Sequence, residues 1–168
     1  MMTMKRTFYF ASMFMAIIAL QSCETPKEAI QEKPNEPVEG IAESLDIPFR
    51  VIADGYLTGN GEEGIGEGGI VINSKEQWEA LVTKMNSVNE TMKEEPIDFD
   101  KMTVLAYFDQ IRGSGGYSVA ISSVARNVDR LSAVVKKTPS KGMDIEIMTQ
   151  PFIIGFIDKT SKSIVFVD

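Results

Sequence analysis

One stretch decides how this chain folds: Met102-Thr103-Val104-Leu105-Ala106-Tyr107-Phe108, a run that is apolar on both faces of an extended strand. Successive side chains of a strand point to opposite faces. Leu105 and Tyr107 would share one face, and their apolar neighbours would share the other. Because a strand of this kind is buried on both sides, we predict that residues 102–108 form a central strand.

A helix is predicted upstream of that strand. Ser74 followed by Gln77 three residues later is a capping box, which marks a helix N-terminus. The residues that follow place large apolar side chains at i, i+3, i+4 and i+7, which is one helical face. They are Trp78, Leu81, Val82 and Met85. We predict a helix that lays this face on a sheet.

Other short segments alternate apolar and polar residues or form short apolar runs, as strands do. They lie near 49–53, 69–72, 117–122, 131–135, 144–147, 152–157 and 164–167. Connections of four to six residues favour antiparallel neighbours, because parallel crossovers need a dozen or more. The predicted fold of residues 47–168 is α+β, a mostly antiparallel β-sheet packed by one principal α-helix.

The beginning of the sequence is typical of a secretory signal peptide. Lys5 and Arg6 precede an apolar segment, Phe8 to Leu20, of 13 residues. This segment is shorter than the roughly 20 residues that a membrane-spanning helix needs. The alternative is an uncleaved N-terminal helix.

Leu20-Gln21-Ser22-Cys23 resembles a bacterial lipobox. The resemblance implies that residues 1–22 are a lipoprotein signal peptide and that Cys23 becomes the acylated first residue. We therefore expect a lipoprotein of the bacterial cell envelope, anchored in a membrane through lipidated Cys23, at the outer membrane or the cell surface. Residues 23–46 are rich in Pro, Glu and Lys and are predicted to form a flexible tether.

Charge and composition exclude several functions. The chain has 24 acidic and 17 basic residues, and without residues 1–22 it keeps 15 basic ones and a formal charge of −9. Such a chain repels phosphate backbones, so we expect no nucleic-acid partner, and no run of basic residues is present to bind anionic headgroups. Histidine is absent and Cys23 is the only cysteine, which excludes ordinary zinc sites and cysteine nucleophiles. We predict no catalytic residue, metal or cofactor.

Two glycine-rich matches to G-x-G-x-x-G, within residues 59–69, are not a dinucleotide fingerprint. That fingerprint must open a helix, whereas Gly69 opens an apolar strand and the loop carries Glu62, Glu63 and Glu67. We interpret these residues as a mobile acidic loop.

Two places are candidate partner-binding surfaces. In Arg112-Gly113-Ser114-Gly115-Gly116-Tyr117 the glycines permit close approach of another backbone, and Tyr117 offers an amphipathic contact. The alternative is a tight loop in which the glycines only permit the turn. In Gln150-Pro151-Phe152 the proline removes a ladder donor, which predicts an irregular exposed edge able to receive a strand.

Several of these segments, taken in order, resemble the PrcB family. The matching motifs are Trp78 on its capped helix, Ile97-Asp98-Phe99, Val104 to Phe108, Gly113 to Ser118, and Thr149-Gln150-Pro151-Phe152. The resemblance covers residues 71–167, and it implies a non-catalytic lipoprotein that assists the assembly or stability of a protease complex at the bacterial surface.

Two functions therefore remain open. The first is an accessory protein, not an enzyme, that binds another envelope protein such as a protease through the two candidate surfaces. The alternative is a small-ligand-binding or hydrolase-like envelope protein with a pocket near Asp109, Arg112 and Tyr117, to which Tyr107 and Asp98 could contribute polar groups.

Overall fold

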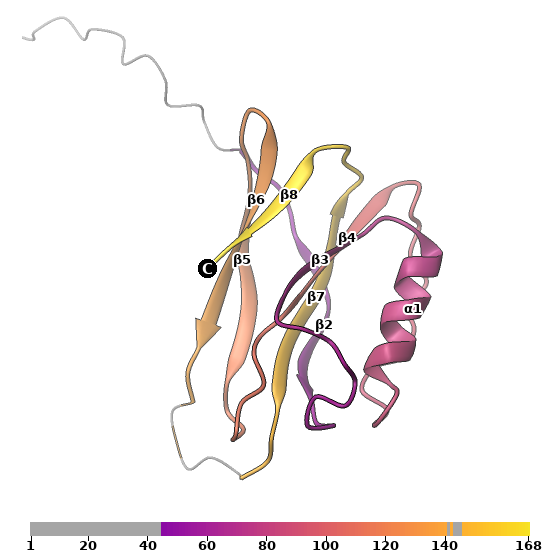
Figure 1. The fold of residues 1–168 in the computed structure, drawn as a ribbon. Coiled ribbons are helices and arrows are strands. Elements are labelled where there is room, and N and C mark those ends of the chain that lie inside the picture. The colour runs from indigo at the N-terminus through magenta and orange to yellow at the C-terminus, as the bar shows by residue number, and fades with distance from the viewer. Residues whose placement is uncertain (1–44, 141, 143–145) are drawn as a thin grey trace, which may run out of the picture. The chain divides into compact units, whose positions relative to one another are not determined.

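The structure, a computed structural model, describes residues 45–140, 142 and 146–168 (Figure 1). The predicted signal peptide, Cys23 and the predicted tether up to residue 44 lie outside the described residues. The last two residues of the predicted tether form β1 (Leu45–Asp46), which pairs with a long strand of the domain. Regular structure therefore begins before residue 47, the predicted boundary.

The strands form two four-stranded sheets. The first sheet has the order β1-β5-β6-β8, and its longer strands are β5 (Ser118–Arg126), β6 (Arg130–Thr138) and β8 (Ser163–Val167). The second sheet has the order β2-β7-β4-β3. Its strands are β2 (Arg50–Leu57), β7 (Gln150–Asp158), β4 (Met102–Phe108) and β3 (Gly68–Ile72). Neighbouring strands run antiparallel, except that β6 and β8 are parallel.

The layers are the first sheet, the second sheet and a helix, α1 (Lys75–Met85), on the outer face of the second sheet (Figure 1). One apolar cluster fills the space between α1 and the second sheet, and another fills the space between the two sheets. The predicted α+β class, with mostly antiparallel strands and one principal helix, is confirmed. The strands divide between two sheets, and the chain passes from one sheet to the other after β1, β4, β6 and β7.

The central position of β4 is confirmed. It lies between β7 and β3, and its residues from Thr103 to Phe108 are all buried. Val104, Ala106 and Phe108 belong to the cluster under α1. Leu105 and Tyr107 belong to the cluster between the sheets. Both cores therefore share this strand.

The helix begins as predicted. Ser74 is the N-cap, and its hydroxyl accepts a long hydrogen bond of 3.4 Å from the Gln77 backbone N–H. The Gln77 side chain accepts from the Asn73 N–H at 2.9 Å, one residue earlier than in a regular capping box. All four residues of the predicted apolar face are buried. The indole of Trp78 also donates to the Glu95 carbonyl at 3.0 Å, which ties the segment after the helix to it.

Two predictions around β7 are wrong. Pro151 does not interrupt the strand: β7 begins at Gln150, includes Pro151 and is an inner strand. Proline is accommodated near the first residue of the strand, where its carbonyl accepts from the Asp109 N–H at 2.8 Å. The predicted strand at 144–147 is not formed by the described residues there, because Glu146 and Ile147 lie outside any strand and Ile147 is exposed.

Gly155 is required by close packing at the centre of β7. Its Cα faces the carbonyl of Arg50 and the ring of Phe49, where β2 has a register shift between Val51 and Ala53. A Cβ atom at this position would overlap both groups. The backbone of Arg50 cannot move away without disturbing the β2–β7 ladder.

We predict that Gly155→Ala lowers the free energy of unfolding by about 1–3 kcal/mol, the usual cost of overpacking a core. Urea unfolding followed by the fluorescence of Trp78, the only tryptophan, measures this. Gly66→Ala is the control, because a Cβ at Gly66 meets nothing within 4 Å. Equal unfolding midpoints for the two variants would contradict the packing argument.

Candidate functional site

The two predicted partner-binding segments meet at the end of the second sheet where β4 ends and β7 begins. Arg112 and Thr149 form an antiparallel bridge: the Arg112 N–H donates to the Thr149 carbonyl at 2.7 Å, and the reverse bond is 3.0 Å. The Thr149 hydroxyl also donates to the Ser114 carbonyl at 3.0 Å. Residues 112–117, hereafter the glycine loop, are thereby fastened to the start of β7.

The side chain of Arg112 is held on two sides. Its Nε and Nη2 atoms donate to Oδ2 of Asp109 at 3.1 and 2.7 Å. Its guanidinium carbon lies 4.7 Å from the centroid of the Tyr117 ring, within the range of a cation–π interaction. Arg112 therefore links the buried end of β4 to the aromatic residue that closes the glycine loop.

Asp109 is a buried carboxylate that needs these cations. It is only 1% exposed, and burying an unpaired carboxylate is strongly unfavourable. Its Oδ2 is paired with Arg112, and its Oδ1 faces the Nζ of Lys137 at 3.4 Å, too long for a good hydrogen bond. The charge is therefore neutralised by Arg112 first and by Lys137 second.

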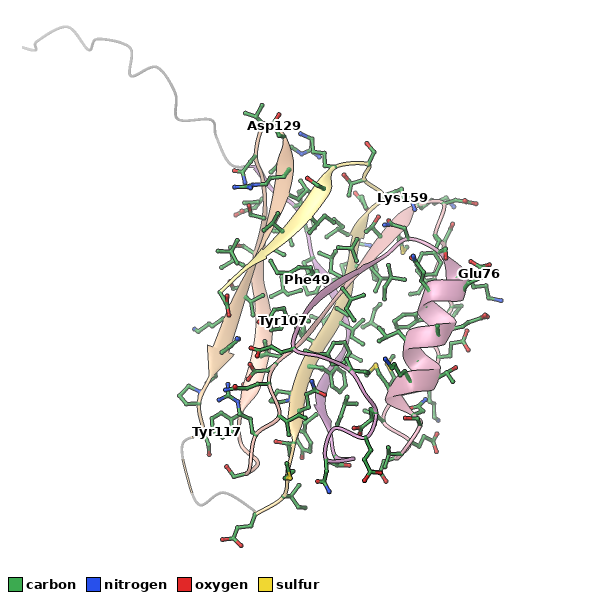
Figure 2. The ribbon with its side chains drawn as sticks, viewed as in Figure 1. Phe49, Glu76, Tyr107, Tyr117, Asp129 and Lys159 are labelled. Carbon is green, nitrogen blue, oxygen red and sulfur yellow. The ribbon has the colours of Figure 1, made fainter. Side chains whose placement is uncertain are left out.

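Lys137, on β6, gathers carboxylates from three separate parts of the chain. Its Nζ lies 2.8 Å from Asp168 and 2.9 Å from Glu67, besides its approach to Asp109. It also lies 5.5 Å from the ring centroid of Tyr107, which points into the space between the sheets (Figure 2). Lys137 thus joins the first sheet to the second beside the glycine loop. Sequence reasoning missed this residue, because no local pattern relates positions 67, 109, 137 and 168.

Hydrogen bonds to Asp168, Glu67 and Tyr107 raise the pKa of Lys137 well above its ordinary value. The hydrogen bond from Lys137 in turn lowers the pKa of the Asp168 carboxyl. A lowered carboxyl pKa stabilises the fold above the ordinary value of about 4, and this contribution is lost as the pH falls through the lower folded value. The raised pKa of Lys137 stabilises the fold below about pH 10.5, and this stabilisation is lost as the pH rises through the pKa of Lys137 in the folded protein.

We predict that Lys137→Met returns the pKa of the Asp168 side chain towards its ordinary value, because the ammonium that holds it down is gone. Carboxyl-carbon NMR titration of the two proteins measures the shift at Asp168 Cγ. Lys136→Met, at the exposed neighbouring position, is the matched control and should leave that pKa unchanged. An Asp168 pKa that is the same in wild type and Lys137→Met would refute the assignment.

One of the two predicted partner-binding segments is not accessible to a partner. Gln150, Pro151 and Phe152 were predicted to form an exposed edge, but all three are buried in β7 between β2 and β4. The Gln150 amide donates to the carbonyls of Ile65 and Asp109, each at 3.0 Å. The Phe152 ring packs 5.9 Å from that of Phe108. These buried residues hold the end of β4 in place and are not themselves available to a partner.

The remaining predicted residues face solvent to different degrees. Gly113 and Gly116 are exposed, while Arg112, Gly115 and Tyr117 are half-buried. Gly116 has a φ of +84°, so a side chain there would be strained. A Cβ at Gly113 would meet nothing within 4 Å. The glycine loop is therefore the accessible part of the site, and Gly116 is the position where a turn requires glycine.

The interpretation of the acidic loop as mobile needs correction, because the fold anchors it. Glu63 is 2% exposed, and its Oε1 accepts from the Gly59 N–H at 2.8 Å. Ile65 is buried in the cluster under α1. Glu67 is paired with Lys137. The loop thus serves as a wall of the charged cluster beside the glycine loop.

The two carboxylates predicted to line a pocket near Arg112 are each paired with a cation in the described part of the chain, Asp98 and the buried Asp109. Asp109 and Arg112 face each other, and Asp98 is paired with exposed Lys101 at 2.9 Å. Three surface concavities of about 250, 300 and 530 Å³ are lined by other residues, among them Arg126, Phe156 and Asp129. Asp109 and Arg112 line none of these three.

Within residues 45–140, 142 and 146–168, no group of three or more His, Cys, Asp or Glu side chains could hold a metal ion. In the same part of the chain, no helix is long and apolar enough to cross a membrane. No family model, curated protein or solved structure matches this chain.

We predict that Arg112→Met lowers the free energy of unfolding by about 2 kcal/mol, because it leaves the buried Asp109 carboxylate without its main partner. This loss of stability is smaller than the loss from breaking a fully buried ion pair, since the Arg112 side chain is 22% exposed and Lys137 remains nearby. Urea unfolding measures the change. Lys136→Met should cost less than about 0.5 kcal/mol, as exposed positions do. Equal stabilities of the two variants would contradict the role of Arg112.

Proposed function

We propose that this chain is a lipid-anchored accessory protein of the bacterial cell envelope. It binds another envelope or surface protein and assists the assembly or stability of a protease complex. Lipidated Cys23 supplies the anchor, and the glycine loop supplies the contact. The protein acts by binding and not by catalysis.

The location of the protein rests on the lipobox-like segment Leu20–Cys23, and the class of partner rests on the resemblance to the PrcB family. A single acyl chain anchors a protein only marginally, whereas the several chains of a processed lipoprotein hold it stably. Anchoring also raises the local concentration of a co-anchored partner, so a modest contact surface is sufficient.

The observation that carries the contact surface is that the glycine loop is accessible and yet held in place. Its backbone is bridged to Thr149, and its Tyr117 ring stacks on Arg112, whose guanidinium is fixed by buried Asp109. A preorganised surface binds without the cost of ordering it. Tyrosine and arginine are also among the residues that most often dominate the binding energy of protein interfaces. The glycines next to them leave room for a partner backbone.

We predict that a photo-reactive amino acid at position 113 forms one dominant cross-link with another envelope protein when the full chain is expressed in its native cells. That protein should be a protease or its precursor. Position 66 is the matched control, because a side chain is equally free there and it lies outside the glycine loop. Mass spectrometry of the adduct identifies the partner.

Substitutions in the glycine loop sharpen this test. Tyr117→Ala should weaken the cross-link at least tenfold, because aromatic anchors of interfaces commonly contribute about 2 kcal/mol. Gly116→Val should have a similar effect by straining the turn, while Gly113→Ala should be tolerated in co-purification. Cross-links of equal strength from positions 113 and 66, unaffected by Tyr117→Ala, would reject the glycine loop as the contact surface.

A further inference from the structure

The tip of the β5–β6 hairpin carries an exposed apolar side chain between two exposed arginines. Val128 and Asp129 form the turn, closed by a hydrogen bond of 2.9 Å from the Asn127 N–H to the Arg130 carbonyl. Val128 is 77% exposed, the largest fraction among the large apolar residues of the described chain. Arg126 and Arg130 flank the turn and are exposed.

A third cation, from another connection of the fold, binds the backbone of the tip. Lys162, in the connection between β7 and β8, donates from its Nζ to the carbonyls of Asn127 and Val128 at 3.2 and 2.6 Å. The Asn127 side chain donates to the Ser132 hydroxyl at 2.8 Å. The carbonyls of Asn127, Val128 and Arg130 are therefore already paired, so these three can enter a less hydrated environment without being left unsatisfied. The Val128 side chain is left pointing outward.

The fold thus builds a basic cluster that is invisible in the sequence. Arg126, Arg130 and Lys162 come together at one tip. The nearby acids are Asp129, Asp46 and Asp158, and Lys159 is a further cation beside Arg126. The tip has a small excess of positive charge on a chain whose net charge is −7. A positive tip with a protruding aliphatic side chain is complementary to anionic headgroups over an apolar interior.

The chain outside the described residues joins the fold at this same tip. Leu45, the first described residue, pairs with Arg126. The segment from Cys23 to residue 44 has 22 residues, and a flexible chain of that length spans roughly 25 Å r.m.s.. The glycine loop lies at the opposite end of the nine-residue strand β5, roughly 27 Å away. Figure 2 shows Asp129 and Tyr117 near opposite ends of the domain.

We infer that the β5–β6 tip, with Val128 at its apex and Arg126, Arg130 and Lys162 around it, rests on the anionic phospholipid headgroups of the membrane that holds the lipid anchor. This inference rests on the proposed function, since the anchor brings the tip within reach of the bilayer. The contact orients the domain with the glycine loop facing away from the membrane, towards a partner.

The test uses the full chain, lipidated in cells, purified and reconstituted in vesicles of phosphatidylcholine and phosphatidylglycerol. Acylation turns the Cys23 sulfur into a thioether, so Val128→Cys provides the only thiol for a spin label. Gly113→Cys, in the glycine loop, is the matched label site. Accessibility of each label to a water-soluble paramagnetic reagent and to oxygen is measured by electron paramagnetic resonance.

We expect the label at position 128 to be at least threefold less accessible to the water-soluble reagent than the label at position 113. The difference should disappear in pure phosphatidylcholine vesicles and in the Arg126→Glu/Arg130→Glu variant. Equal accessibility of both labels in anionic vesicles would overturn the membrane contact and leave the anchor standing. Two labels per chain in the intact mass would mean a free Cys23 sulfur, and would overturn the proposed anchor together with this inference.

Discussion

Burial of β4 on both faces is the constraint on which the rest of the structure depends. Its alternating side chains supply one core under α1 and another between the two sheets. Because β4 is an inner strand, β7 and β3 must pair with its two edges, and both of its faces must be covered. The helix and the first sheet provide these covers. The positions of the loops at the ends of β4, including the glycine loop, follow from this arrangement.

The charged cluster depends on the end of that strand. Asp109 directly follows β4 and is 1% exposed, on the same side as Tyr107, where it faces Lys137 of the first sheet. A buried carboxylate is tolerated only with close cations, and the fold supplies Arg112 from the adjacent loop and Lys137 from the first sheet. The same pairing that stabilises Asp109 therefore fixes the side chain of Arg112 and, through it, the ring of Tyr117. The ion pair that the buried Asp109 carboxylate requires is therefore also the contact that holds Arg112 and Tyr117 in place.

Local patterns were sufficient to predict the central strand 102–108, the cap at Ser74 and the apolar face of α1. Local patterns could not predict that Pro151 lies inside β7, because whether a strand can accommodate proline depends on the strands that pair with it. The two sheets and the cluster around Lys137 could not be predicted either. Both depend on strand order, which brings positions 67, 109, 137 and 168 together without leaving a periodic signal. For the same reason, the sequence showed no basic cluster, although the fold brings Arg126 and Lys162 to one hairpin tip.

The proposed roles belong to two ends of one domain: a hairpin tip beside Leu45, and the glycine loop at the far end of β5. Both proposed roles require the protein to be attached to a membrane through position 23. The intact mass of the protein extracted from its native envelope tests this most directly. We predict a chain that begins at Cys23 and carries a diacylglyceryl thioether. A chain that retains residues 1–22 with an unmodified sulfur would contradict it.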